Sequence, residues 1–174
     1  MPPLPVTRTY LEMRSPDELV PAREPAPGAR IERLGGCAVS FWRYLYAEVG
    51  RAYRWTDRLT WTDDQVRAYL TDPGVTLHVL YVDHAPGGYY ELRQHDDGSM
   101  EIAYFGLLPE YTGRGFGGWM LSRAVEDAWA RGATRVWLHT CTLDHPAALP
   151  NYTRRGFTPY RSETYTASPE EQTG

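Results

Sequence analysis

The hydrophobic and polar positions along the first third of the chain predict one strand and two helices. Residues 7–14 alternate well enough for a strand, whereas residues 21–30, rich in proline, alanine and glycine, predict a loop. Apolar residues at helical spacing predict a helix over 37–50. We expect Thr62 to cap a second helix that ends before Asp72.

The middle of the chain predicts three consecutive strands, over 75–82, 89–93 and 101–108. Glycine-rich or aspartate-rich turns separate them, and Pro109 ends the third. Because the connections are short, we expect an antiparallel meander.

After this meander the pattern changes to helices that alternate with strands. A helix is predicted over 117–131, a strand over 135–140 and a last strand over 157–165. A short helix is predicted from Pro146 to about Arg154, with Asp144 as its cap. The whole order predicts a mixed α/β fold.

Length and composition fit a single domain. The chain has 174 residues, of which 42% are hydrophobic, so we expect one domain over residues 1–165 and a polar tail over 166–174. No apolar run is long enough to cross a membrane and no secretory leader precedes the domain, so a cytoplasmic protein is expected. Cys37 and Cys141 form no ligand pair, and no metal site is expected.

The distribution of charge narrows the class of ligand. The net charge is −4, and all 18 basic residues are arginine, which excludes lysine Schiff-base chemistry. Residues 111–161 nevertheless hold seven arginines against three acids. A positive half on an acidic protein favours a small polyanion over a nucleic acid. The alternative is a solvated charged surface without a ligand.

The glycine-rich stretch from Leu107 to Gly118 lies between a predicted strand and a predicted helix. Closely spaced glycines let the backbone approach a phosphate, and the first turn of a helix offers free N–H groups and a partial positive charge. This combination predicts a pyrophosphate site.

Two other interpretations of the same loop stay open. Gly113, Gly115 and Gly118 match the dinucleotide fingerprint G-x-G-x-x-G. Against it, the preceding strand belongs to a meander instead of starting a β-α-β unit, and residues 138–143 lack the acid that would bind a ribose. A purely structural glycine turn is the second alternative.

The loop also resembles motif A of the GNAT superfamily, the Gcn5-related N-acetyltransferases. That motif reads Gln/Arg-x-x-Gly-x-Gly/Ala at the start of a helix, and residues 112–117 read Thr-Gly-Arg-Gly-Phe-Gly. Thr112 departs from the usual first residue. A second stretch, residues 147–157, resembles the family's alanine-bearing helix followed by Tyr-x-x-x-Gly-Phe, with Tyr152 at the tyrosine position. Pro150 inside that helix and His145, where many relatives have Asn, are departures.

The resemblance, good over about residues 75–160, implies a central, mostly antiparallel, twisted sheet of 6–7 strands flanked by helices, splayed at the acetyl-CoA site. It implies an N-acetyltransferase that moves an acetyl group from acetyl-CoA to a primary amine by direct attack in a ternary complex. A backbone N–H near Leu107 would polarise the thioester carbonyl. The cofactor-binding residues implied are Leu107, Leu108, Thr112, Gly113, Arg114, Gly115, Phe116, Gly117 and Gly118.

The resemblance further implies catalytic roles for two residues. Tyr152 matches the family's general acid, which would protonate the departing thiolate; the alternative is a core tyrosine. Glu101 has the spacing of the catalytic glutamate in the histone-acetylating branch and would be the base; the alternative is an exposed glutamate. His139 is the second candidate base.

The acceptor amine is not identified by the sequence. Trp42, Tyr53, Trp55 and Trp61 could form a cage for a cation, although such residues more often form core. A polyamine, an aminoglycoside or a lysine side chain of another molecule all stay open, and so does a homodimer. Two other functions are a non-catalytic acyl-CoA-binding module and a nicotinamide-binding protein.

Overall fold

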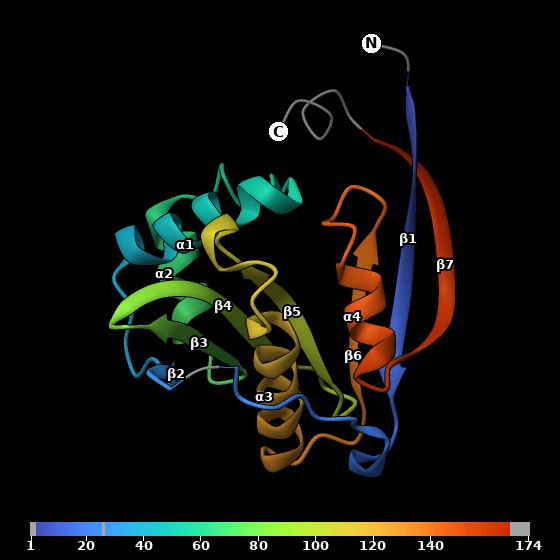
Figure 1. Ribbon diagram of the computed structural model, residues 1–174. Helices are drawn as coiled ribbons and strands as arrows, with labels where there is room; N and C mark the ends of the chain where they lie inside the picture. The colour runs from blue at the N-terminus through green and yellow to red at the C-terminus, as the bar shows by residue number, and fades with distance from the viewer. Residues whose placement is uncertain (1–2, 26, 168–174) are drawn as a thin grey trace.

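A computed structural model describes residues 3–25 and 27–167. Within them, seven strands form one sheet in the order β2-β3-β4-β5-β6-β1-β7, with α1 and α2 on one face and α3 and α4 on the other (Figure 1). The strands are β1 Leu4–Met13, β2 Ala29–Arg33, β3 Val75–Val82, β4 Ala85–Gln94, β5 Met100–Leu107, β6 Val136–Cys141 and β7 Thr158–Ala167. The helices are α1 Val39–Tyr53, α2 Asp63–Thr71, α3 Phe116–Ala130 and α4 Ala148–Arg154, with 3-10 turns η1 Pro16–Glu18 and η2 Pro109–Tyr111. This architecture confirms the predicted class. None of the helices described here has both the length and the apolar character that crossing a membrane requires.

Most element boundaries shift by a few residues from the sequence prediction, and two differences matter for the sheet. The loop predicted over 21–30 ends in β2, a short edge strand in which Ile31 is the main apolar residue, so its alternation is too weak to stand out. The last strand extends to Ala167, so the first two residues of the predicted polar tail pair with β1. The rest of that tail, residues 168–174, lies outside the described residues.

The N-terminal strand lies between the two C-terminal strands. β1 runs antiparallel to β6, with Arg8 opposite Cys141, and antiparallel to β7, with Arg8 opposite Glu163. Figure 1 shows β1 and β7 together at one edge of the molecule. Periodicity predicts that residues 7–14 are extended but not which strands they join. The pairing brings Arg8 beside the end of β6.

Strands β5 and β6 separate shortly after they meet. They run parallel and pair only at Met100 with Val136 and at Glu101 with Trp137, after which they diverge (Figure 1). This confirms the predicted splay. Because α3 connects the two strands, β5 does begin a β-α-β unit, and the expectation that it does not was wrong. β5 has two edges, so it serves both the meander with β4 and the parallel crossover.

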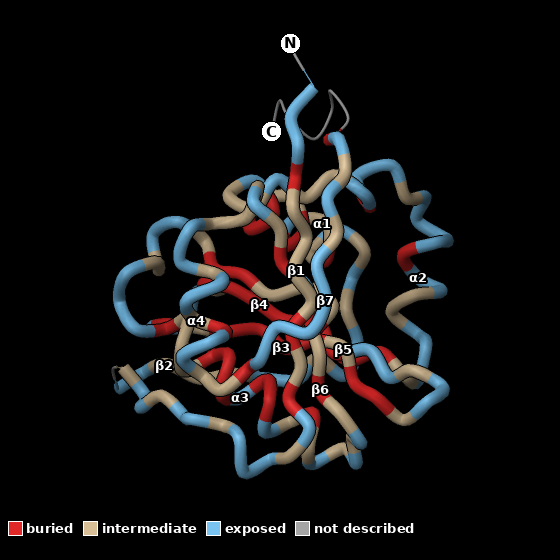
Figure 2. The backbone as a smooth tube through the Cα atoms, turned by 90° about the vertical axis from the view of Figure 1, so that its right-hand side faces the viewer, coloured by how far each residue is buried: buried red, intermediate tan, exposed pale blue. Residues whose placement is uncertain are grey.

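Each face of the sheet carries its own hydrophobic core. One cluster joins α3 to residues of β1, β4, β5 and β6, and includes Met120, Leu121 and Leu138. The other packs Trp42 and Tyr46 of α1 against β3 and β4. Since both faces are covered, β3 is buried almost throughout and β4 over its middle, whereas β7 is largely exposed (Figure 2).

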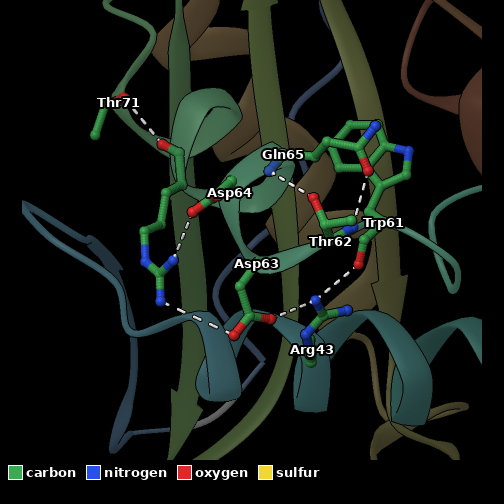
Figure 3. Close-up of polar contacts among 8 residues, drawn as sticks. Arg43, Trp61, Thr62, Asp63, Asp64, Gln65 and Thr71 are labelled. Carbon is green, nitrogen blue, oxygen red and sulfur yellow. Dashed lines mark hydrogen bonds and ion pairs between the residues drawn. The ribbon is translucent and has the colours of Figure 1, made fainter.

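Thr62 caps the start of α2, as the sequence predicts, and Gln65 completes a reciprocal cap that was not predicted (Figure 3). The Thr62 hydroxyl accepts the Gln65 N–H at 3.2 Å, and the Gln65 side chain accepts the Thr62 N–H at 2.8 Å. Arg43 of α1 donates to Asp63 at 2.7 Å and to the Trp61 carbonyl at 2.8 Å. The cap stabilises the helix by about 1 kcal/mol, and Arg43 ties α2 to α1.

Asp144 does not cap α4, contrary to the prediction. The helix begins at Ala148, and its N-cap, Ala147, makes no side-chain hydrogen bond. Asp144 instead accepts the Thr140 hydroxyl at 2.6 Å and the Cys141 N–H at 2.9 Å, so it closes the turn that leaves β6. Pro150 is the third residue of α4, where the first turn has no intrahelical partner for an N–H.

Candidate functional site

Two cavities meet where β5 and β6 diverge. The first, here called the loop cavity, has a volume of about 210 Å³ and lies against the glycine-rich loop and α4. The second, the polar cavity, has a volume of about 310 Å³ and lies against β5, β6, the middle of β1 and the segment after α1. Tyr53, Phe105 and Tyr152 line both. Two ligands in these cavities would therefore face each other across three aromatic rings.

The glycine-rich loop forms one wall of the loop cavity. Gly113 and Gly115 have φ of 70° and 85°, a region that disfavours a side chain. Gly115 is the N-cap of α3, and no side chain caps this helix. The first N–H groups of α3, including those of Gly117 and Gly118, are left without intrahelical partners, and both glycines line the cavity. The arrangement suits an anionic ligand.

The predicted cofactor residues divide into two groups. Those that line the loop cavity are Leu107, Thr112, Gly113, Gly115, Gly117 and Gly118. Leu108, Arg114 and Phe116 line neither cavity: Phe116 is 1% exposed in the core, and the exposed Arg114 guanidinium lies 5.1 Å from its ring centre. The Leu108 N–H donates to the Gly87 carbonyl at 2.8 Å.

Three further residues of the loop cavity were not predicted from the sequence to bind a ligand, and His145 among them was noted only as a departure from the family pattern. Asn151 and Arg154 of α4 and His145 before it line the cavity opposite the glycines. Arg154 has no carboxylate partner within the described chain, so it could meet a phosphate. One turn of helix separates Asn151 from Arg154, and this is the only sequence signal for their shared face.

The hydroxyl of Tyr53 accepts the Leu107 N–H, the backbone group that was expected to polarise a thioester carbonyl, at a distance of 3.2 Å. The Tyr53 ring lies so close to Gly106 that a Cβ there would come within 2.6 Å of it. Burial raises the pKa of Tyr53, so its hydroxyl stays neutral. Tyr53 therefore controls access to the Leu107 N–H from the boundary of the two cavities.

Tyr152 of α4 lies at the same boundary. Its ring packs edge-on against Phe105 and Phe157, at centroid distances of 6.2 and 6.3 Å, and it is 7% exposed. Within the described chain its hydroxyl forms no hydrogen bond. Burial raises the pKa of Tyr152, and the carboxylate of Asp144 raises it further. The phenol thus keeps its proton at neutral pH.

Glu101 reaches the polar cavity from β5. One carboxylate oxygen lies 2.8 Å from Nε2 of His95, and the side chain is 13% exposed. Glu101 is therefore a largely buried acid on the cavity wall with a partner at one carboxylate oxygen, not the freely exposed glutamate that was the alternative.

His139 and Asp144 are two further titratable groups on that wall. His139 stands opposite Tyr10 of β1, and its pKa is lowered by removal from water and by the charge of Arg8. Burial raises the pKa of Asp144, an acid that sequence reasoning assigned only to a helix cap. Among the described residues, no three His, Cys, Asp or Glu side chains are grouped to hold a metal ion.

The predicted aromatic cage is occupied by the protein's own arginine. The buried Arg58 guanidinium lies 4.7 Å from the Trp61 ring centre and 4.1 Å from that of Tyr104. Arg58 also pairs at 2.8 Å with Glu91, which accepts the indole N–H of the fully buried Trp42 at the same distance. Trp42 and Trp61 therefore form core around an internal ion pair, whereas Tyr53 and Trp55 line the polar cavity.

The sequence matches a known family over most of its length. Residues 41–157 match the model described as "Acetyltransferase (GNAT) family". Uncharacterised N-acetyltransferases of Mycobacterium bovis and Mycobacterium tuberculosis are 36% identical over 70 residues, which is 40% of this chain and 45% of theirs. The match thus spans less than half the length of these curated relatives.

Solved structures agree with this at the level of the fold. A GCN5-related N-acetyltransferase from Kribbella flavida superposes with a TM-score of 0.67 at 20% identity, over 92% of this chain and 57% of that one. An aminoglycoside acetyltransferase from an uncultured soil metagenomic sample gives 0.63 at 12% identity, over 76% of this chain and 90% of that one. With the family match, the uncapped glycine loop and the splay of β5 from β6, the chain belongs to the GNAT acetyltransferase family.

Proposed function

We propose that the protein transfers an acetyl group from acetyl-CoA to a primary amine by direct attack within a ternary complex. The observation that carries the proposal is the meeting of the loop cavity and the polar cavity at Tyr53, Phe105 and Tyr152. An acetyl donor in one cavity and an amine acceptor in the other would have their reacting ends at this boundary. The phenol of Tyr152, a potential proton donor, lines the same boundary.

The loop cavity fits the anionic part of acetyl-CoA. The left-handed backbone at Gly113 and Gly115 and the uncapped start of α3 turn N–H groups toward the cavity, and Arg154 adds a positive charge. When bound, acetyl-CoA supplies an activated acyl group as a thioester. The Leu107 N–H lies between this loop and the boundary and can stabilise negative charge on the acyl oxygen once Tyr53 gives it up.

Tyr152 is suited to protonate the leaving sulfur. A thiol has an ordinary pKa of about 8.5, whereas burial raises the pKa of Tyr152 above the ordinary value of about 10. The phenol therefore keeps its proton at neutral pH and can share it with the sulfur through a hydrogen bond that strengthens as negative charge develops there. Its hydroxyl has no competing partner within the described chain, so it is free for this role.

The amine must lose a proton before it attacks, since an alkylamine of pKa about 10.4 is almost fully protonated at neutral pH. His139 is neutral there because its pKa is lowered, and Glu101 lines the same cavity. Either can accept the proton, directly or through water. Cys141 is a poor acyl carrier because burial raises the pKa of its thiol, which supports direct transfer over a covalent intermediate.

Calorimetric titration with acetyl-CoA, with NADPH in parallel, tests the cofactor assignment. Binding of acetyl-CoA alone is expected, followed by amine-dependent release of CoA. Binding of NADPH alone would favour the dinucleotide interpretation of the loop. Binding of acetyl-CoA with no turnover of any amine would favour the non-catalytic acyl-CoA-binding module.

A further inference from the structure

The polar cavity is lined by arginines as well as by acids, although a cationic amine alone would call only for acids. Arg8, Arg54, Arg58 and Arg93 line it, against the acids Asp57, Glu101 and Asp144. Arg58 is neutralised by Glu91, so its charge is already balanced within the core. The other three arginines form no ion pair with any carboxylate of the described residues, so the cavity holds three guanidinium groups and three carboxylates that are not paired with each other.

Of these three arginines, Arg8 has the surroundings that best indicate an anionic ligand. It projects from β1 beside the end of β6, and its guanidinium carbon lies 5.0 Å from the ring centre of Tyr165. Its Nε–H is buried and has no hydrogen-bond acceptor within the described chain, whereas Tyr10 and Tyr165 interact with the same guanidinium and raise its pKa. A buried donor without an acceptor is costly, and a planar guanidinium is the group that best pairs with two oxygens of one anion.

The acids of the cavity do not satisfy Arg8. Asp144 is close enough to act electrostatically on Arg8, His139 and Tyr152, yet it forms no ion pair with Arg8 and spends its hydrogen bonds on the Thr140 hydroxyl and the Cys141 N–H. The cavity therefore presents positive and negative groups that do not neutralise each other. A ligand with both kinds of charge would satisfy both.

We infer that the acceptor is a small primary amine that also carries a carboxylate, with the carboxylate bound by Arg8 in the polar cavity. This inference rests on the proposed function and names its substrate class. The ammonium end faces Asp144 and Glu101 near Tyr152, and the carboxylate pairs with the guanidinium of Arg8 on the cavity wall. A volume of about 310 Å³ admits a molecule of amino-acid size. A polycation such as a polyamine or an aminoglycoside would place further positive charges against Arg8, Arg54 and Arg93.

The experiment compares amino acids with the amines that they become on loss of the carboxylate, for example phenylalanine with phenethylamine and lysine with cadaverine. The rate of CoA release gives kcat/KM for turnover, and calorimetry in the presence of CoA gives binding. Because each pair differs only in the carboxylate, the ratio within a pair isolates its contribution. Hydrogen bonds to a charged group predict a preference for the amino acid of roughly tenfold to a hundredfold.

The variant Arg8→Gln is expected to remove this preference while the affinity for acetyl-CoA stays unchanged. Arg8→Lys should restore only part of it, because an ammonium lacks the two-pronged geometry. Arg51→Gln, at an exposed arginine of α1 that lines neither cavity, is the matched control and should keep the wild-type ratio. O-Phosphoethanolamine paired with β-alanine distinguishes a phosphate from a carboxylate as the anion.

Three results would overturn the inference while acetyl-CoA binding stays intact. The decarboxylated amines could be acetylated as fast as the amino acids or faster, O-phosphoethanolamine could be preferred to β-alanine, or neither amino acids nor amines could bind the CoA complex. A failure to bind acetyl-CoA would instead overturn the proposed function on which the inference rests. If Arg8→Gln keeps the preference for amino acids over their decarboxylated amines, another group binds the carboxylate and the assignment to Arg8 is wrong.

Discussion

Replacing Tyr152 by phenylalanine removes one oxygen from the boundary between the two cavities and leaves the ring in place. The ring makes the contacts with Phe105 and Phe157, and the hydroxyl makes none within the described chain, so the free energy of unfolding should hardly change. General acids contribute on the order of 10² to 10⁴ in rate. A thiolate is a fair leaving group, so we expect the lower end, about a hundredfold loss in kcat, or about 2.7 kcal/mol.

The assay is the release of CoA followed with a thiol reagent, together with the affinity for acetyl-CoA by calorimetry. Affinity should stay within about twofold, and a urea titration should give the wild-type midpoint. Tyr44→Phe, at an exposed tyrosine of α1, is the control for loss of a phenol and should be fully active. Because burial raises the pKa of Tyr152, wild-type kcat should not fall up to pH 10. A Tyr152→Phe enzyme with kcat within twofold of wild type would reduce Tyr152 to a packing residue and refute the general-acid role.

Three further predictions concern stability, each read from urea midpoints. Arg58→Ala leaves the fully buried Glu91 without its ion pair and should destabilise the protein by about 3–5 kcal/mol, against less than about 0.5 kcal/mol for the exposed Arg67→Ala; similar midpoints would show that the pair carries no such charge. Gly132 has a φ of 85° and open space around its Cα, so Gly132→Ala should lower the free energy of unfolding by about 1 kcal/mol. At Gly156 an added Cβ would lie 2.0 Å from the Glu18 carbonyl oxygen, so Gly156→Ala should cost about 2 kcal/mol more. Equal losses for the two variants would contradict the clash at Gly156. Burial lowers the pKa of His78 to about 4 from an unfolded value of about 6.5, so the unfolded chain binds the extra proton and stability should fall as the pH drops from 6.5 to 4. His78→Asn should flatten this dependence and His84→Asn should not.

The sequence predicts local elements well because they depend on local chemistry. The meander, the helix after the glycine loop and the cap by Thr62 follow from alternation, helical spacing and side-chain type. What local patterns do not contain is the choice of partners. The placement of β1 between β6 and β7 is decided by which sheet edge a strand can reach, and it is this placement that brings Arg8 into the polar cavity.

The candidate site shows the same division. Tyr152, Glu101 and most of the glycine loop could be singled out because they stand in recognisable motifs. Asp144 was assigned to the wrong neighbour because a turn residue after a strand can close that strand as easily as cap the next helix. The aromatic residues around Arg58 were open to interpretation as a ligand cage, since the sequence does not show that an internal arginine reaches them from the following loop.

Initial rates measured over a grid of acetyl-CoA and acceptor concentrations test most directly whether the two cavities act together. Double-reciprocal lines are expected to intersect, because both substrates must be bound at the Tyr152 boundary before the acetyl group moves. Parallel lines, with an acetylated protein trapped in the absence of the amine, would mean that the acetyl group rests on the enzyme, and direct transfer between the cavities would be contradicted.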